Sequence, residues 1–402
     1  MKVKVEKRPI VVPGFRFAGV ACGIKPSGKK DLTLIVSDVP ATAAAAFTTN
    51  KSTSAAVLVG RKRVKAGRLQ AVVVNSGIAN VATGQPGIRL ASDSCSLVGQ
   101  TLRINQQLVF PSSTGKIGVL PPWEKMQTGI LAACAALSPR KFWDALAGIM
   151  TTDAFPKAAV RQISLDGKLV TIVGMAKGAG MINPNMATML CYVLTDARIE
   201  KTALKRALDH TLADSFNAIS VDGDTSTSDT ILLLANGLAG NREVRTTGKD
   251  FKTFETIVGE ILCELSRLVV KDGEGATRVV DIFVRGAKTS AEAEKVARTV
   301  ARSPLVKTAF FGGDPNWGRI VCAVGYAGAV LDLNKLAISI GDVPIGRNGI
   351  STGVESEQQA AAVMQRPEFS LTIDLHLGRG SAHIVTSDLS IEYVRFNSAY
   401  ST

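Results

Sequence analysis

Residues 177–190 join a glycine- and proline-containing loop to the start of an apolar segment. The loop reads Lys-Gly-Ala-Gly-Met-Ile-Asn-Pro-Asn-Met-Ala-Thr, and the apolar run 189–194 follows it without a break. Glycine and proline favour turns, whereas a short run of large apolar residues is typical of a buried strand. Thr188 lies at the junction. This is where an N-terminal nucleophile is expected, because such an enzyme cuts its own backbone, here between Ala187 and Thr188, to free the attacking residue.

The chemistry of an N-terminal threonine explains why these residue types are useful. Its hydroxyl attacks, and the freed α-amine, with a pKa of about 7.7–8.0, can act as the base near neutral pH. The chain has three histidines, His210, His376 and His383, and nothing near them indicates a triad or a zinc site. Its six cysteines show no close pair with metal-ligand spacing, so we predict no metal. On residue pattern alone, a second interpretation stays open, in which Thr188 only begins a strand.

Further short motifs follow the same order along the chain as in one enzyme family. With residues 177–190, they make the sequence resemble the ornithine acetyltransferase family, also called glutamate N-acetyltransferases. The motifs are residues 12–15, 23–25, 75–80, 113–115, 151–153, 272–277, 314–319 and 397–402. Together they span the whole chain, so the resemblance covers all of it.

The resemblance implies a fold and a maturation step. The implied fold is α/β, a layered αββα-type sandwich of the self-cleaving ornithine acetyltransferase kind, with a smaller C-terminal lobe. Cleavage would give an α part, residues 1–187, and a β part, residues 188–402. The family also implies a heterotetramer of two α and two β parts.

The implied activity is acetyl transfer through Thr188. The acetyl group passes from N2-acetylornithine to Thr188 and then to L-glutamate, with no cofactor. Whether acetyl-CoA also serves as an acetyl donor stays open. The alternative is an aminopeptidase or amidohydrolase on the same self-cleaving scaffold, in which water resolves the acyl-enzyme.

The resemblance also assigns roles to individual residues. Thr114 and Gly115, expected in a strand-to-loop turn, would form the oxyanion hole. Lys177 would bind the substrate's α-carboxylate, and Glu274, expected in a tight turn after a long helix, would bind the side-chain ammonium of ornithine. Further substrate contacts fall on Thr151, Thr188, Asn397 and Thr402. A contact of Asn316 with the site is left open.

Composition is consistent with a soluble enzyme of small substrates. The chain has 402 residues, 46% of them hydrophobic, and a formal net charge of +13. Such a charge raises nucleic-acid binding as an alternative, but the most basic segment, residues 61–68, has no interleaved aromatic residues for stacking. We therefore predict that it is a solvated turn or loop and that the surplus charge attracts small anions. No apolar run is long enough to span a membrane, and no targeting segment is evident, which predicts a cytoplasmic protein.

Hydrophobic periodicity predicts the elements around these residues. Residues 69–74, 108–110 and 231–235 are expected to be strands. Leu204, Leu208, Leu212 and Phe216 recur every four residues and predict a helix, as do the apolar positions between 254 and 265. A capping box, Thr289 with Glu292, predicts another helix that ends before Pro304. Residues 222–230 are expected to be a loop.

Overall fold

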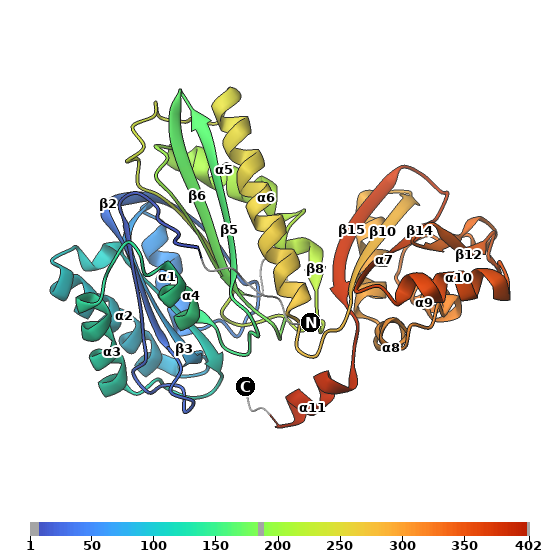
Figure 1. The fold of residues 1–402 in the computed structure, drawn as a ribbon, viewed down its shortest axis with the longest axis horizontal. Coiled ribbons are helices and arrows are strands. Elements are labelled where there is room, and N and C mark those ends of the chain that lie inside the picture. The colour runs from blue at the N-terminus through green and yellow to red at the C-terminus, as the bar shows by residue number, and fades with distance from the viewer. Residues whose placement is uncertain (1–7, 184–188, 400–402) are drawn as a thin grey trace.

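A computed structural model describes residues 8–183 and 189–399, which form two mixed sheets with helices packed around them (Figure 1). The larger sheet has eight strands in the order β4-β3-β2-β9-β7-β6-β5, with β1 paired to β2. Its strands are β1 (Phe15–Val20), β2 (Leu32–Phe47), β3 (Arg68–Ile78), β4 (Val109–Lys116), β5 (Lys157–Leu165), β6 (Lys168–Lys177), β7 (Leu190–Thr195) and β9 (Thr230–Ala235). The β3–β4 and β7–β9 pairs are parallel, and the other pairs are antiparallel.

Six α-helices accompany the larger sheet. They are α1 (Ala55–Val64), α2 (Gly84–Leu102), α3 (Trp123–Ala135), α4 (Phe142–Ile149), α5 (Lys201–Leu212) and α6 (Lys249–Lys271). Helices α2 and α3 pack along β2–β4, α4 packs on β1 and β2, and α6 packs on β5 and β6. The amphipathic pattern of α6 explains its position, since Phe254, Val258, Ile261 and Leu265 are all buried in the core that this helix shares with the sheet.

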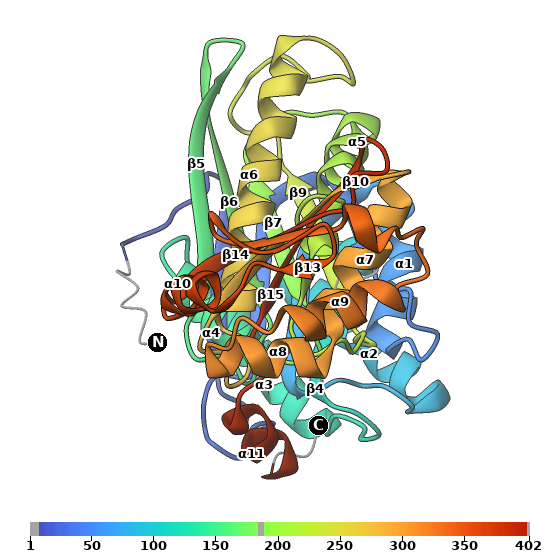
Figure 2. The same ribbon diagram turned by 90° about the vertical axis from the view of Figure 1, so that its right-hand side faces the viewer.

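The smaller sheet forms the C-terminal lobe. Its seven strands run in the order β13-β12-β11-β14-β10-β15-β8. They are β8 (Ile219–Ser220), β10 (Val279–Ala287), β11 (Ala337–Ile340), β12 (Val343–Arg347), β13 (Ile350–Ser351), β14 (Glu368–Asp374) and β15 (Gly380–Ser387). Helices α7 (Ser290–Arg302), α8 (Pro304–Gly312), α9 (Trp317–Gly325) and α10 (Val354–Met364) cover it, and α6 lies between the two sheets (Figures 1 and 2). The last helix, α11 (Ile391–Ala399), leaves the lobe and lies apart from its sheet in both views.

The predicted layered α/β fold with a smaller C-terminal lobe is confirmed. The helices at 249–271 and 290–302 and the strand at 230–235 also agree with prediction. The Thr289 hydroxyl accepts a hydrogen bond from the Glu292 N–H, as the capping box requires. Among the described helices, none combines the length and the apolar character that a membrane span needs.

Two predicted strand boundaries and one predicted loop were wrong. Strand β3 continues to Ile78, and β4 continues through residues 111–116, although proline, serine and glycine there suggested a loop. The proline is tolerated because β4 lies at the edge of the sheet, where one side of the strand needs no ladder hydrogen bonds. Residues 61–64 form the last turn of α1 rather than a loop. One of them, Val64, packs against the hydrophobic core.

Candidate active site

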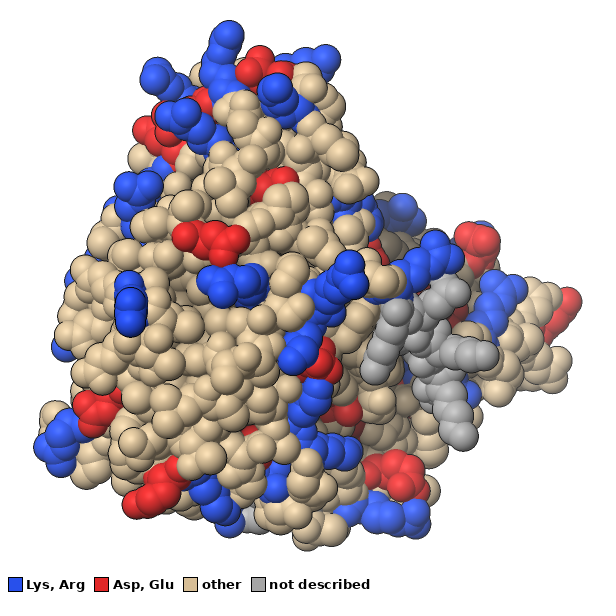
Figure 3. All heavy atoms as spheres, turned by 60° about the vertical axis from the view of Figure 1, so that its left-hand side comes forward, with Lys and Arg blue, Asp and Glu red and all other residues tan. Residues whose placement is uncertain are grey.

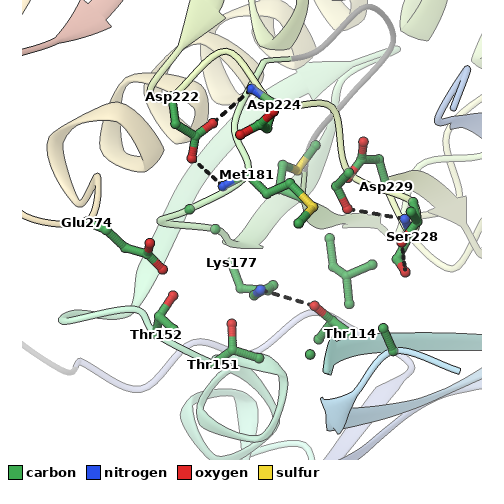
Figure 4. Close-up of a pocket in the computed structure, with 18 of the residues that line it drawn as sticks. Thr114, Thr151, Thr152, Lys177, Met181, Asp222, Asp224, Ser228, Asp229 and Glu274 are labelled. Carbon is green, nitrogen blue, oxygen red and sulfur yellow. Dashed lines mark hydrogen bonds between the residues drawn. The ribbon is translucent and has the colours of Figure 1, made fainter. Parts of the chain in front are cut away.

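A pocket lies where β4 and β6 end and β7 begins (Figure 4). Residues of the turn after α6 and of helix α11 complete its lining. Six residues that the sequence assigned to the site line it, although they come from segments up to 283 residues apart. These residues are Thr114, Gly115, Thr151, Lys177, Glu274 and Asn397. The remaining predicted site residues, Ala187, Thr188 and Thr402, lie outside the described residues. Met189 and Leu190, which directly follow Thr188, line the same pocket.

Thr114 and Gly115 lie within strand β4, not in the turn that the sequence predicted. They pair with Ser76 and Gly77 of β3 in parallel register. The φ angle of Gly115 is +126°, a conformation that favours glycine. A Cβ atom at Gly115 would also lie 2.3 Å from the carbonyl carbon of Gly77. Glycine is therefore needed here for β4 to approach β3 so closely beside the pocket.

Lys177 brings a buried cation to the pocket. It ends β6, its residue exposure is 7%, and its Nζ donates a hydrogen bond of 3.2 Å to Oγ1 of Thr114. Burial lowers the pKa of Lys177, and the charge of Asp153 opposes that shift. A lysine in such a place can bind a carboxylate, because few water molecules compete for its ammonium group.

Glu274 lies in the turn after α6, as predicted, and faces the pocket from the side opposite Thr114 (Figure 4). Its N–H donates to the carbonyl of Ala179 at 2.9 Å. A Cβ atom at Gly180 would lie 2.4 Å from the carboxylate of Glu274, so glycine there makes room for the carboxylate. Nδ2 of Asn397, from α11, donates to Oε2 of Glu274 at 3.0 Å. Thr151 and its neighbour Thr152 both line the pocket near Glu274.

Asp222 lines the pocket on the side opposite Thr151 and Thr152 (Figure 4). It was not among the site residues predicted from the sequence. Its carboxylate accepts hydrogen bonds from the N–H groups of Met181 at 2.5 Å and Ile182 at 2.8 Å. Met181 has a φ angle of +57°, so this clamp holds an uncommon backbone conformation. Burial raises the pKa of Asp222 to about 6, although the N–H groups of Asp224, Ile182 and Met181 lower it in part. The only sequence signal was its place in a polar loop.

Asp229 is a second acid that the sequence did not single out. Its residue exposure is 1%, and neither carboxylate oxygen makes a hydrogen bond of good geometry among the described residues. Burial raises its pKa well above the usual value, outweighing the opposing effects of Ser226 and Lys177. The next residue, Thr230, donates its N–H to the carbonyl of Met189 at 2.9 Å. A buried acid with a raised pKa therefore lies beside the start of β7.

Several other candidate residues lie away from the pocket. Asn316 caps α9 by accepting a hydrogen bond from the Arg319 N–H, and it does not line the pocket. None of the three histidines lines the pocket. No group of three or more metal-ligating side chains occurs in residues 8–183 and 189–399. Cys95 and Cys191 are buried, whereas Cys263 and Cys322 are exposed.

The basic segment at residues 61–68 is used within the fold. Arg61 donates to the carbonyl of Thr48 at 2.5 Å and lies over the ring of Phe47, and Arg63 donates to the carbonyl of Val109 at 2.9 Å. On the face shown in Figure 3, basic side chains form a broken band that acidic side chains interrupt. Two of the basic side chains in this segment, Arg61 and Arg63, therefore have partners within the protein itself, and no nucleic acid is needed to explain them.

Comparison with known proteins identifies the family. The ArgJ family matches residues 16–402. The chain is 46% identical over 391 residues to the arginine biosynthesis bifunctional protein ArgJ of Geobacter sulfurreducens, covering 97% of this chain and 100% of that protein. It is 47% identical over 393 residues to the protein of the same name from Syntrophotalea carbinolica, covering 98% of this chain and 100% of that protein. The crystal structure of ArgJ from Bacillus halodurans is 37% identical, with a TM-score of 0.51, and the match covers 53% of this chain and 100% of that chain. The resemblance found in the sequence is confirmed, and this chain belongs to the ArgJ family of arginine biosynthesis.

Proposed function

We propose that this protein transfers the acetyl group of N2-acetylornithine to L-glutamate through an acetyl-Thr188 intermediate. One observation carries the proposal: a single pocket contains a buried cation, Lys177, an anion, Glu274, and the Thr114–Gly115 pair. An acylated α,ω-diamino acid has a matching carboxylate, side-chain ammonium and amide. Family membership adds support, because the relatives are named for arginine biosynthesis.

In the first half-reaction, the Thr188 hydroxyl oxygen attacks the acetyl carbonyl carbon, and its proton passes to the α-amine of Thr188. The carbonyl oxygen becomes an oxyanion, which the hydroxyl of Thr114 and the N–H of Gly115 stabilise. When the C–N bond breaks, the ammonium returns the proton to the departing nitrogen of ornithine. The product is free ornithine and an acetyl ester on Thr188.

In the second half-reaction, the amine of glutamate attacks this ester. The bond to the Thr188 oxygen breaks, the proton released by the amine returns to that oxygen, and N-acetylglutamate leaves. Lys177 can bind the α-carboxylate of either amino acid, since both carry one at the same distance from the reacting nitrogen. Glu274 would attract only the diamino acid, which favours ornithine as the first product.

The proposal includes maturation by cleavage between Ala187 and Thr188, which frees the α-amine that serves as base. The mature enzyme would consist of residues 1–187 and 188–402, assembled as two copies of each. No cofactor takes part in these steps. Acetyl-CoA is a candidate second donor, because its thioester could acetylate Thr188 by the same attack.

The decisive experiment is to incubate the purified protein with N2-acetylornithine and glutamate, with and without acetyl-CoA, and to quantify acetylglutamate, ornithine and acetate. We expect acetylglutamate and ornithine in equal amounts without acetyl-CoA. Incubation with N2-acetylornithine alone should leave an acetyl group, detectable by mass spectrometry, on the fragment that begins at Thr188. Acetate as the main product at saturating glutamate would indicate the hydrolase alternative. The Thr188→Ala variant is the negative control.

A further inference from the structure

Three buried charged side chains lie directly behind the pocket and connect the segments that carry its substrate-binding residues. Nζ of Lys157 forms ion pairs of 2.7 Å with Asp153 and 2.5 Å with Asp272, and each of these side chains is at most 3% exposed. We call Asp153, Lys157 and Asp272 the buried triad. Its members come from the segment after α4, the start of β5 and the end of α6.

Both carboxylates of the buried triad also bond to backbone near a pocket residue. Asp153 accepts hydrogen bonds from the N–H groups of Thr151 at 2.9 Å and Gly178 at 2.7 Å. Asp272 accepts from the N–H of Ala154 and lies two residues before Glu274. The buried triad therefore joins the three segments that carry Thr151, Lys177 and Glu274.

We propose that Asp153 is a positioning residue, which holds these segments together and places a carboxylate charge beside Lys177, the residue that binds a substrate carboxylate. This inference rests on the proposed function of Lys177. The carboxylate of Asp153 accepts a hydrogen bond from the N–H of Gly178, the residue that follows Lys177, and so fixes the backbone beside Lys177. Its negative charge also acts on Lys177.

The charges around Lys177 show why Asp153 has this role. Burial is the main effect that lowers the pKa of Lys177, and Asp153 is the strongest opposing charge, ahead of Glu274 and Asp229. Lys157 acts in the opposite direction, and Lys25 is a further positive neighbour. Asp153 itself remains ionised. Burial would raise its pKa, but the charges of Lys157 and Lys177 hold it below the usual range.

Asp272 offers a matched control within the buried triad. It pairs with the same lysine as Asp153, yet it is not among the main charges acting on Lys177. Removing either carboxylate charge leaves Lys157 with one carboxylate partner instead of two. Both substitutions should therefore lower the melting temperature, whereas only the change at Asp153 should alter the charge of Lys177.

The test compares Asp153→Asn, Lys157→Met and Asp272→Asn with the wild type, using KM for N2-acetylornithine from pH 7 to 9.5. In Asp153→Asn, Lys177 should lose its proton at lower pH, so KM should rise about tenfold for each pH unit above that point. Lys157→Met removes a repelling charge, so the alkaline rise should move to higher pH. Asp272→Asn should leave the position of the rise unchanged. For all three variants, kcat should change less than KM.

Shifts in the same direction for Asp153→Asn and Lys157→Met, or equal shifts for Asp153→Asn and Asp272→Asn, would overturn the proposal, because they would indicate a purely structural role. If a variant is too slow to assay, calorimetric affinity for ornithine replaces KM. If Asp153→Asn cannot be purified, the upward shift in Lys157→Met and the absence of a shift in Asp272→Asn still decide the question. A wild type that makes no acetylglutamate would instead refute the proposed function.

Discussion

Nδ2 of Asn397 donates a hydrogen bond of 3.0 Å to Oε2 of Glu274, which lies 123 residues earlier in the chain. Helix α11 thus brings Asn397 into contact with the carboxylate of Glu274 in the pocket. Tyr393, from the same helix, also lines the pocket, and none of the residues of α11 is buried. A helix without buried residues is easily displaced, so we expect the closure of this side of the pocket to depend on how α11 is held.

The first prediction concerns this tail. Deleting residues 398–402 should loosen the wall that α11 provides and admit water, so that more of the acetyl-enzyme is hydrolysed. The ratio of acetate to acetylglutamate should rise relative to the full-length enzyme at equal glutamate. Asn397→Ala, which removes the hydrogen bonds from Nδ2 to Glu274 and to the carbonyl of Tyr393 but keeps the tail, should change that ratio less. An unchanged ratio with normal turnover would show that the tail does not exclude water.

The second prediction concerns maturation. The expressed protein should run as fragments of 187 and 215 residues, which together make the 402 of the chain. The Thr188→Ala variant should remain a single inactive chain, because it lacks the attacking hydroxyl. N-terminal sequencing of the second fragment should begin at Thr188, and any other first residue would refute the assigned cleavage site. Thr152→Ala serves as a control that keeps this hydroxyl.

The third prediction concerns the oxyanion hole. Thr114→Ala should lower kcat by about 10²–10³-fold, because the lost donor is most valuable in the transition state. KM should change less, although Lys177 loses a hydrogen-bond acceptor at 3.2 Å. Thr114→Ser, which keeps the hydroxyl, should retain most of the activity. A raised KM with unchanged kcat would make Thr114 a binding residue instead.

The fourth prediction concerns substrate choice. Glu274→Gln should raise KM for N2-acetylornithine by about 10–100-fold, as expected when a charged hydrogen bond worth roughly 1.5–3 kcal/mol is lost. KM for N-acetylnorvaline, which lacks the side-chain amine, should be the same for wild type and variant. Equal effects on both substrates would show that Glu274 shapes the pocket without recognising the ammonium.

The fifth prediction concerns Asp222. Its pKa in the folded protein is raised to about 6, so the folded state binds a proton that the unfolded chain does not bind between about pH 4 and 6. The stability that this group contributes is fully present below the unfolded pKa and is lost as the pH rises through 6. As the pH falls from 7 to 4, the free energy of unfolding should therefore increase in wild type relative to Asp222→Asn. Parallel pH profiles in urea denaturation would contradict this.

The sequence predicted the pocket residues more successfully than it predicted their supports. The family motifs located Thr151, Lys177 and Glu274, because each motif is short and local. Asp153 belongs to one of those motifs, and Asp272, the other carboxylate that pairs with Lys157, lies in another motif 119 residues away. No local pattern indicates that a buried lysine joins the two carboxylates. Asp222 and Asp229 resemble ordinary loop residues until the fold removes water from them. The end of β4 was also predicted wrongly from the local sequence. Its proline, serine and glycine are typical of a loop, and they are tolerated in a strand because β4 lies at the edge of the sheet.

The order of the central strands has a consequence for how the enzyme could be made. Strands β9 and β7 follow the predicted cleavage site in the chain, and they lie between β2 and β6, which precede it. Lys177 of β6 pairs with Leu190 of β7, so the sheet itself bridges the two sides of the cut. Neither piece could complete this sheet alone, since each would expose unpaired strand edges. We therefore expect folding to come before cleavage, and we expect each piece to aggregate when it is expressed without the other.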